Sequence, residues 1–379
     1  MEIVLVVSGI QQSMKESLAL TTLHLAKQLT VTGNHVTVIS RNKWNQPSSE
    51  VVDGVSFVRT KSLWKFPLYN KLLAFPFAVR KLAGKRIDVI HSFSASPVLV
   101  LRSLIAKLYA RNALVVHTLK SYPIKKDIKA KSGSFFLSRL SDSFYRLLNY
   151  ADFVTVPTET YARKLTEKGV DKKKIKVIYS FIDLHTFFPQ NKEKLKKKYG
   201  YQSKKIIFHY GSMWEIKGTD YLINSLPLII KHVPNVKVVL APRNQEQALE
   251  KYMPLITKLD IEKHVEFILH DVKIEDYVNL ADVVVLPYPH LEGTEGNPSC
   301  LLEALACKTP VVSTELPELK ELFSDCAVLV KPADARALAR AVISVLKGNN
   351  SQRVEKGLES VKKFGIDSIT EQFLSLYHK

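Results

Sequence analysis

Short apolar runs rich in β-branched residues alternate with longer segments of helical periodicity through the first half of the chain. Because these runs do not alternate strictly between apolar and polar positions, they predict strands buried on both faces, as in a parallel sheet covered by helices. The predicted strands are residues 2–8, 35–40, 55–60, 88–93, 113–118, 152–157 and 174–180. This order of elements is typical of a doubly wound α/β domain.

A polar, lysine-rich segment at residues 183–203 interrupts the pattern, and a second series of strands follows it. Its predicted strands are residues 206–212, 236–242, 265–270, 282–289, 310–314 and 326–332. We therefore expect two Rossmann-like domains, at 1–183 and 204–350, and a helical tail at 351–379 that crosses back to the first domain. Because ligands of such sheets bind beyond the carboxyl ends of the strands, the two domains should face one interdomain cleft.

The composition is that of a globular protein, with 46% hydrophobic and 24% charged residues. The three cysteines, Cys300, Cys307 and Cys326, lack metal-ligand spacing and are interpreted as thiols in a reducing compartment, with no disulfide and no structural metal. The amino terminus is interpreted as a first strand and not as a signal peptide, and no run reaches the ~20 apolar residues that span a bilayer. These features predict a cytoplasmic protein.

The positive charge is concentrated in the first half of the chain. Residues 1–190 hold 29 Lys and Arg against 12 Asp and Glu, or +17, whereas residues 191–379 hold 26 against 24, or +2. Segments 61–86 and 120–140 combine many basic residues with aromatic residues, as expected of a face that binds anionic lipid. An amphipathic helix that packs its aromatic residues inward is the alternative. No nucleic-acid-binding module is recognisable, so nucleic acid is not an expected partner.

One stretch, "EGTEGNPSCLLEALACKTPVV" at residues 292–312, stands out because the chain has almost no other dense motif. It predicts a loop, then Asn297 as a helix cap and Pro298 at the first helical position. Free amides at a helix start bind phosphate, and glycines let a ligand approach the backbone. Glu295 and Glu303 could then hold hydroxyl groups on either side of a diphosphate. A capped helix with an exposed Glu303 is the structural alternative.

This stretch resembles the signature of the retaining GT-B glycosyltransferases of glycosyltransferase family four, also called glycosyl transferases group 1. The order and spacing of the signature are kept through Pro287, Glu295, Gly296, Pro298, Glu303, Ala304, Ala306, Pro310, Val311 and Val312. The resemblance extends to residues 209–226 and 151–160, and covers essentially the whole chain.

The resemblance implies roles for individual residues. Glu295 would hold hydroxyls of the donor sugar, Glu303 would hold the ribose hydroxyls, and Lys217 would neutralise the diphosphate together with the helix start. His117 would lie beside the donor sugar. The implied catalytic residues are Glu295, His117 and Lys217, and the implied donor-binding residues are Gly9, Ser212, Lys217, Glu295, Gly296, Asn297, Pro298, Ser299 and Glu303.

The chain departs from the family pattern at several positions. Gly9 stands alone where family members commonly carry a glycine pair, and Ser212 occupies the position of the arginine that often precedes the phosphate lysine. The segment "VKVVLAPRNQ", residues 236–245, lacks the glycines that normally follow this strand. The identity of the donor is therefore left open.

The expected function is transfer of a hexose-type sugar from a nucleotide sugar to a lipid-linked or cell-surface glycan acceptor, with retention of configuration. No cofactor and no metal are expected, since a lysine and a helix start can stabilise the departing diphosphate and no Asp-X-Asp triplet occurs. The basic half predicts peripheral binding to the inner face of the cell membrane. A non-catalytic nucleotide-sugar binder and a GT-B nucleotide-sugar epimerase are the alternatives.

Overall fold

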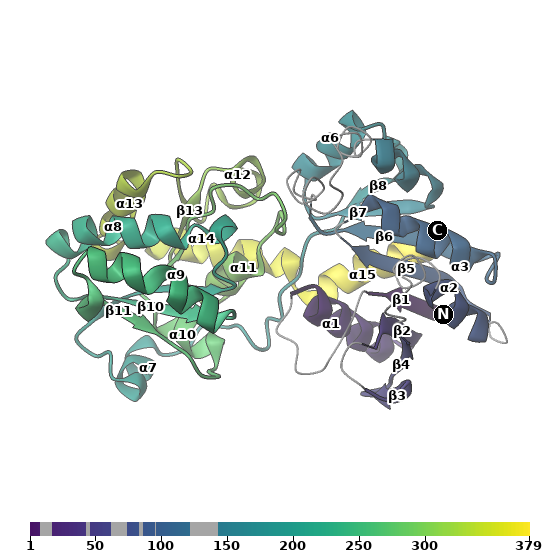
Figure 1. Ribbon diagram of the computed structural model, residues 1–379, viewed down its shortest axis with the longest axis horizontal. Helices are drawn as coiled ribbons and strands as arrows, with labels where there is room; N and C mark the ends of the chain where they lie inside the picture. The colour runs from purple at the N-terminus through teal and green to yellow at the C-terminus, as the bar shows by residue number, and fades with distance from the viewer. Residues whose placement is uncertain (8–16, 43–45, 62–73, 83–85, 95, 122–142) are drawn as a thin grey trace. The chain divides into compact units, whose positions relative to one another are not determined.

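The computed structural model describes the whole chain except residues 8–16, 43–45, 62–73, 83–85, 95 and 122–142. The chain divides into two compact units (Figure 1). Unit 1 comprises Met1–Tyr179, Glu292–Gly296 and Ile366–Lys379. Unit 2 comprises Ser180–Leu291 and Asn297–Gly365.

Unit 1 is built on an eight-stranded sheet in the order β3-β4-β2-β1-β5-β6-β7-β8. Its strands are β1 (Glu2–Val6), β2 (His35–Arg41), β3 (Ser49–Val52), β4 (Val55–Thr60), β5 (Val89–Ser94), β6 (Leu114–Leu119), β7 (Phe153–Val156) and β8 (Ile175–Val177). Every predicted strand of this half is present. The sequence pattern missed β3, which pairs antiparallel with β4 at the sheet edge, because its half-exposed residues carry no buried apolar run.

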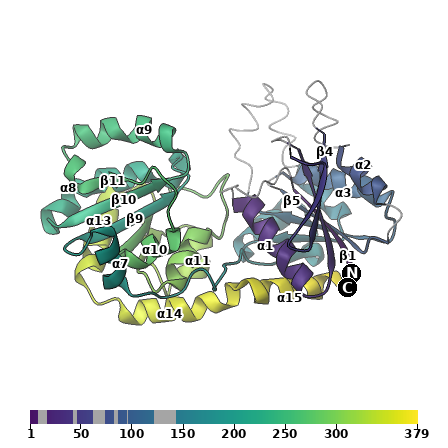
Figure 2. The ribbon, with the colours of Figure 1, turned by 90° about the horizontal axis from the view of Figure 1, so that it is seen from below.

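Helices cover both faces of the unit 1 sheet and bury apolar residues of its central strands, such as Leu5, Val38 and Ile90. Among the described residues, these helices are α1 (Ser17–Val31), α2 (Ala74–Lys81), α3 (Val100–Lys107), α6 (Glu159–Glu167) and α15 (Ile366–Tyr377). Figure 2 shows α1 and α15, from opposite ends of the chain, lying side by side. The Gln28 amide donates to Asp367 Oδ1 over 2.5 Å between them.

Unit 2 contains a six-stranded parallel sheet in the order β11-β10-β9-β12-β13-β14. Its strands are β9 (Lys205–Gly211), β10 (Val236–Pro242), β11 (Val265–Phe267), β12 (Val283–Leu286), β13 (Val311–Thr314) and β14 (Val328–Val330). Its helices are α7 (Lys192–Tyr199), α8 (Thr219–His232), α9 (Gln245–Lys258), α10 (Ile274–Leu280), α11 (Ser299–Ala306), α12 (Pro317–Phe323), α13 (Ala335–Lys347) and α14 (Ser351–Val361). The predicted pair of doubly wound, Rossmann-like α/β domains is confirmed.

The lysine-rich segment 183–203 is part of unit 2 and contains α7. The Lys196 side chain is buried, donates to Asp282 Oδ2 over 2.7 Å and reaches the Lys204 carbonyl. Asp282 also accepts from the backbone amide of Ile206 at the start of β9. The polar character that indicates a linker in the sequence therefore serves a buried ion pair that attaches α7 to the sheet.

The helical tail is interrupted between its two helices. A 3₁₀ turn at Lys362–Phe364 ends at Gly365, and α15 begins at the next residue. The Ile182 amide donates to the Phe364 carbonyl over 2.9 Å, and Ile182 forms an isolated parallel β-bridge with Gly365. The break between the two helices is therefore held by backbone pairing within unit 2. None of the helices within the described ranges combines the length and hydrophobicity needed to span a bilayer.

Candidate functional site

Lys217 lies at the carboxyl edge of the unit 2 sheet, in the short connection between β9 and α8. The next residue, Gly218, has a φ of +69°, and a Cβ there would lie 1.9 Å from the Pro287 carbonyl oxygen. Only glycine permits this close approach of two backbones. The connection is therefore held against the loop after β12, and Lys217 Nζ lies 5.0 Å from the centre of the Tyr288 ring.

Glu303 faces the end of β9 from helix α11. The Tyr210 hydroxyl donates to Glu303 Oε2 over 2.5 Å and lies 3.2 Å from the Cys300 carbonyl oxygen. Burial, followed by the nearby Glu303 charge, raises the pKa of Tyr210 well above its ordinary value. The tyrosine thus remains a donor that orients the carboxylate. Tyr210 was not among the residues predicted from the sequence.

The start of α11 differs from the expectation. Helix α11 begins at Ser299, and Pro298, in extended conformation, occupies the cap position. Asn297 is fully buried and its amide group lies 3.4 Å from the Ser180 carbonyl oxygen. The prediction of Asn297 as the helix cap is wrong, because the helical turn starts one residue later and the side chain is used by the backbone of residue 180.

The pKa of Cys300, in the first turn of α11, is influenced by three charged side chains near it. Burial, followed by the Glu303 carboxylate, raises the pKa of its thiol to about 12, whereas Lys217 and Arg243 act in the opposite direction. The thiol is therefore protonated and unreactive near neutral pH. The two cations, the start of α11 and Glu303 consequently share one region of unit 2.

His117 lies near the carboxyl end of β6 in unit 1 and is fully buried. Ser92 Oγ lies 2.6 Å from Nδ1, and Ser94 Oγ lies 3.1 Å from Nε2. Burial, reinforced by the Arg102 charge, lowers the pKa of His117 to about 3. The ring is therefore neutral at physiological pH, with a protein partner at each nitrogen.

Glu295 belongs to the loop Glu292–Gly296, which packs as part of unit 1. The Tyr161 hydroxyl donates to the Thr294 carbonyl over 3.4 Å, and a Cβ at Gly296 would lie 3.0 Å from the Tyr161 ring. Burial lowers the pKa of Lys120, which directly follows β6, and the Glu295 charge opposes that effect. The sequence analysis included Lys120 only in the basic segment 120–140 and not among the site residues, although a lysine at the end of a buried strand is a signal that could have indicated it.

The remaining predicted residues are placed as follows. Ser212 follows β9 and Ser299 opens α11, both half-buried in unit 2. Gly9 lies outside the residues that the structure describes. Within unit 2 the structure brings Lys217, Glu303 and the start of α11 together, and within unit 1 it brings Glu295 close to Lys120.

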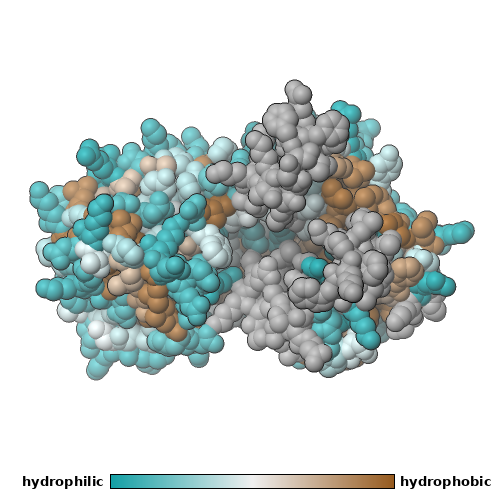
Figure 3. Space-filling model, viewed as in Figure 1, coloured by the Kyte–Doolittle hydropathy of each residue, from teal (hydrophilic) through white to brown (hydrophobic). Residues whose placement is uncertain are grey.

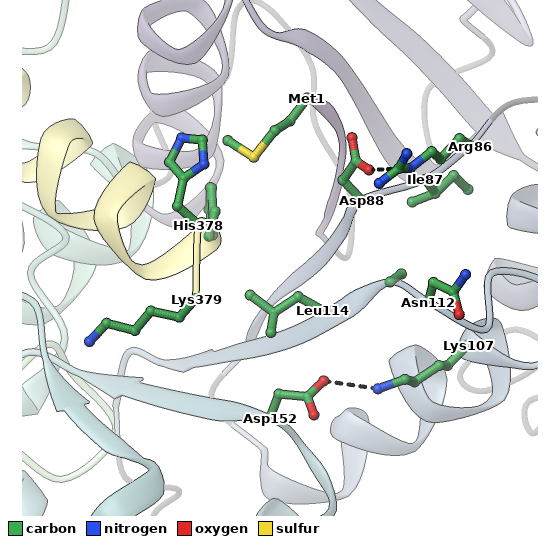
Figure 4. Close-up of a pocket in the computed structure, with 12 residues that line it drawn as sticks. Met1, Arg86, Ile87, Asp88, Lys107, Asn112, Leu114, Asp152, His378 and Lys379 are labelled. Atoms are coloured by element: carbon green, nitrogen blue, oxygen red, sulfur yellow. Dashed lines mark hydrogen bonds and ion pairs between the residues drawn. The ribbon is translucent and has the colours of Figure 1, made fainter.

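A pocket of about 700 Å³ lies at the opposite, amino-terminal edge of the unit 1 sheet (Figure 4). Four of its charged side chains form two ion pairs, with 3.0 Å between Arg86 and Asp88 and 2.9 Å between Lys107 and Asp152. Both carboxylates also accept backbone amides of neighbouring strands. These acids stabilise strand ends, so the pocket is not assigned to the chemistry.

Comparisons with known proteins agree with this arrangement. Residues 18–186 match the model of Glycosyltransferase Family 4, and residues 191–357 match that of Glycosyl transferases group 1. An uncharacterised glycosyltransferase of Methanocaldococcus jannaschii is 22% identical over 352 residues, 79% of this chain and 84% of the relative. A phosphatidyl-myo-inositol mannosyltransferase of Mycobacterium leprae is 26% identical over 167 residues, 42% of each chain.

The solved structure of Anabaena HepE in complex with UDP and glucose is similar over 100% of this chain and 99% of HepE, with a TM-score of 0.77 and 17% identity. This similarity shows the fold, which is GT-B. With one family model matching each half of a chain that has two Rossmann-like units, the protein belongs to the group 1 and family 4 glycosyltransferases of GT-B fold.

Proposed function

We propose that this glycosyltransferase moves a hexose-type sugar from a nucleotide-sugar donor to an acceptor, with retention of the anomeric configuration and without a metal ion. The observation that carries the proposal is the group of Lys217, Glu303 and the α11 start at the carboxyl edge of the unit 2 sheet. Parallel α/β sheets bind ligands at this edge. The UDP and glucose in HepE, a protein of the same fold, support a nucleotide sugar as the donor.

The chemistry follows from charge. The diphosphate that leaves the sugar gains negative charge in the transition state, and Lys217 together with the free amides at the start of α11 stabilises that charge. The Glu303 carboxylate, oriented by the Tyr210 hydroxyl, accepts hydrogen bonds from the ribose hydroxyls. In unit 1, Glu295 accepts from hydroxyls of the transferred sugar, and His117, neutral at physiological pH, lies beside that sugar as the third catalytic residue.

Two alanine variants test the assignment. Lys217→Ala and Glu295→Ala should each lose roughly 2–4 kcal/mol of transition-state stabilisation, measured as acceptor-dependent nucleotide release, with an unchanged circular dichroism spectrum. Lys258→Ala and Glu262→Ala, exposed at the ends of other unit 2 elements, are the matched controls. Activity within about threefold of wild type would remove that residue from the site. Nucleotide release that requires no acceptor would exclude a transferase.

Retention and metal independence have their own measurements. The product anomer, determined by NMR, should have the configuration of the donor. Activity should persist in excess chelator, because the proposed diphosphate contacts are a lysine and backbone amides. Strict dependence on a divalent ion, or an inverted product, would contradict the corresponding part of the proposal.

We further propose that the acceptor is lipid-linked or part of a cell-surface glycan, and that unit 1 binds the anionic inner face of the cell membrane. Phe77 in α2 exposes 42% of its surface, and Leu108 and Tyr109, directly after α3, expose 69% and 36%. The Arg80 guanidinium lies 5.9 Å from the Tyr109 ring. Figure 3 shows hydrophobic surface over the region of α3. Most of segment 61–86, including Lys65 and Lys71, and nearly all of 120–140 lie outside the described residues.

Vesicle sedimentation tests this surface. The wild type should sediment with phosphatidylserine vesicles and be released by salt, since each basic group near the surface contributes ~1 kcal/mol and is screened within ~10 Å at 0.1 M. Arg80→Glu with Leu108→Ser should reduce sedimentation without changing donor affinity. Val31→Ser, which changes a 78% exposed residue on α1, is the control. Equal sedimentation of the variant and wild type would favour a soluble acceptor.

A further inference from the structure

Arg243 directly follows β10, at the same edge of the sheet as Lys217. The parallel register pairs Pro242 with Gly211, and the Arg243 amide donates to the Gly211 carbonyl over 2.9 Å. Continuing that register places Arg243 opposite Ser212, on strands about 4.8 Å apart. The base of the arginine side chain is therefore fixed beside the connection that carries Lys217.

The loops that hold these two residues are tied to one another. Asn244 Oδ1 accepts from the Met213 amide over 2.7 Å, and the Tyr252 hydroxyl lies 3.2 Å from the Met213 carbonyl oxygen. Met213 itself is buried. The backbone on both sides of Arg243 is thus held against the connection that carries Lys217, which fixes the point from which the guanidinium extends.

The guanidinium shares its region of unit 2 with a second cation, Lys217, and with the Glu303 carboxylate, which accepts from the Tyr210 hydroxyl. Arg243 is exposed and makes no ion pair or side-chain hydrogen bond within the part of the chain that the structure describes. The Gly211 backbone, which accepts from the Arg243 amide, also packs against α11, since a Cβ at Gly211 would lie 3.9 Å from Cys300 Sγ. An arginine without a counter-charge, next to a second cation and a helix start, suits a ligand with more than one negative charge.

We propose that Arg243 binds the diphosphate of the nucleotide-sugar donor as the partner of Lys217. The inference rests on the proposed function and assigns a second cation to the same site. A guanidinium can donate two parallel hydrogen bonds to phosphate oxygens, which an ammonium group cannot. Lys217 and Arg243 would then contact the diphosphate from the ends of two neighbouring strands.

Binding of UDP, GDP and ADP by titration calorimetry tests the assignment, with the matching nucleosides measured by ligand-observed NMR. For the diphosphate that binds the wild type best, Arg243→Ala should weaken affinity by about tenfold or more, equivalent to ~1.4 kcal/mol, and leave nucleoside affinity unchanged. The diphosphate affinity of Arg243→Lys should lie between those of the wild type and Arg243→Ala. Arg340→Ala, exposed on α13, should bind like the wild type.

A double variant that moves the arginine to the neighbouring strand end distinguishes loss of the positive charge from a structural effect of the Arg243→Ala substitution. Adding Ser212→Arg to Arg243→Ala returns a guanidinium to the neighbouring strand end and should recover most of the lost affinity. Wild-type diphosphate affinity in Arg243→Ala, or an equal loss for diphosphate and nucleoside, overturns the assignment. A wild type that binds none of the three diphosphates refutes the proposed function itself, and this inference with it.

Discussion

The pair of Tyr210 and Glu303 shows how one hydrogen bond can set the direction of a binding group. The tyrosine is buried at the end of β9, and its hydroxyl is the donor that the structure gives to Glu303 Oε2. A carboxylate held in this way has lost part of its rotational freedom before the nucleotide sugar binds. The hydrogen bond from Tyr210 to Glu303 therefore contributes more to the affinity for the nucleotide sugar than to the rate of the chemical step.

Tyr210→Phe removes only this hydroxyl. A hydrogen bond to a charged group is worth about 1.5–3 kcal/mol, so the KM for the donor should rise roughly tenfold or more with little change in kcat. Tyr201→Phe is the matched control, because Tyr201 donates to Glu266 over 2.8 Å elsewhere in unit 2. Steady-state kinetics decides the matter, and an unchanged KM in Tyr210→Phe would contradict the orienting role.

Some residues of the candidate site can be predicted from the sequence and others cannot. Glu295, Glu303 and Lys217 are recognisable because they occupy fixed positions in short motifs. Tyr210 and Arg243 are not, since their importance depends on which residues 93 positions away, or on the next strand, lie beside them. Asn297 was misassigned because a local capping pattern cannot include the backbone of residue 180.

At the scale of elements, the tight connection between β9 and α8 depends on one glycine. Gly218 lies in the left-handed region and directly below the Pro287 carbonyl, so conformation and space both exclude a side chain. The turn carries Lys217, and an altered turn would therefore change the position of the ammonium group as well as the stability of unit 2.

Gly218→Ala should therefore destabilise the protein much more than Gly200→Ala. Gly200 ends α7 with a φ of +79° but has nothing within 4 Å of an added Cβ, so its substitution isolates the conformational cost, about 1–2 kcal/mol. Gly218→Ala adds a clash with backbone, and we expect a loss of roughly 3 kcal/mol or more. Urea unfolding compares the stability of the two variants. Equal losses of stability would mean that the turn at Gly218 rearranges to accept a side chain without cost.

Helix α15 is attached to the unit 1 sheet by a buried polar chain. The Tyr377 hydroxyl lies 2.5 Å from His91 Nδ1, and His91 Nε2 lies 2.6 Å from Thr118 Oγ1. Thr118 Oγ1 in turn lies 2.5 Å from Thr155 Oγ1. These contacts join β5, β6 and β7 to a helix that is 286 positions from His91 in the chain.

Tyr377→Phe should leave a ring nitrogen of buried His91 without its partner. An unsatisfied buried polar group costs about 1–3 kcal/mol, and the loss should appear as a lower unfolding midpoint and faster hydrogen exchange in α15. Tyr150→Phe, at a residue with 70% exposure in unit 1, is the control. If both variants unfold at the wild-type midpoint, the chain of contacts does not stabilise the helix.

At the scale of the whole molecule, three buried histidines make stability depend on pH. Burial lowers the pKa of His91 well below its ordinary value, that of His117 to about 3 and that of His209 to about 4. The unfolded chain therefore binds more protons than the native state below pH 6.5. Their contribution is complete above pH 6.5 and is lost as the pH falls.

His209→Gln tests this dependence in unit 2. His209 Nδ1 lies 2.8 Å from the Val285 carbonyl oxygen and Nε2 lies 2.9 Å from Thr219 Oγ1. Between pH 6.5 and 5 the wild type should lose up to about 1.4 kcal/mol per pH unit for each such histidine. The variant should lose correspondingly less, whereas exposed His232→Gln should follow the wild type. Identical pH slopes for His209→Gln and wild type would refute this account.

The order of strands and helices, the two Rossmann-like units and the glycosyltransferase motif were determined by the sequence alone. Periodicity and motif spacing are local properties, and burial on both faces of a parallel sheet leaves a clear apolar run in each strand. Only the tertiary structure decided the antiparallel β3, the attachment of α7 to unit 2, the break before α15, and the placement of Arg243 beside Ser212. Each of these depends on register or on a partner distant in the chain, which local patterns do not encode.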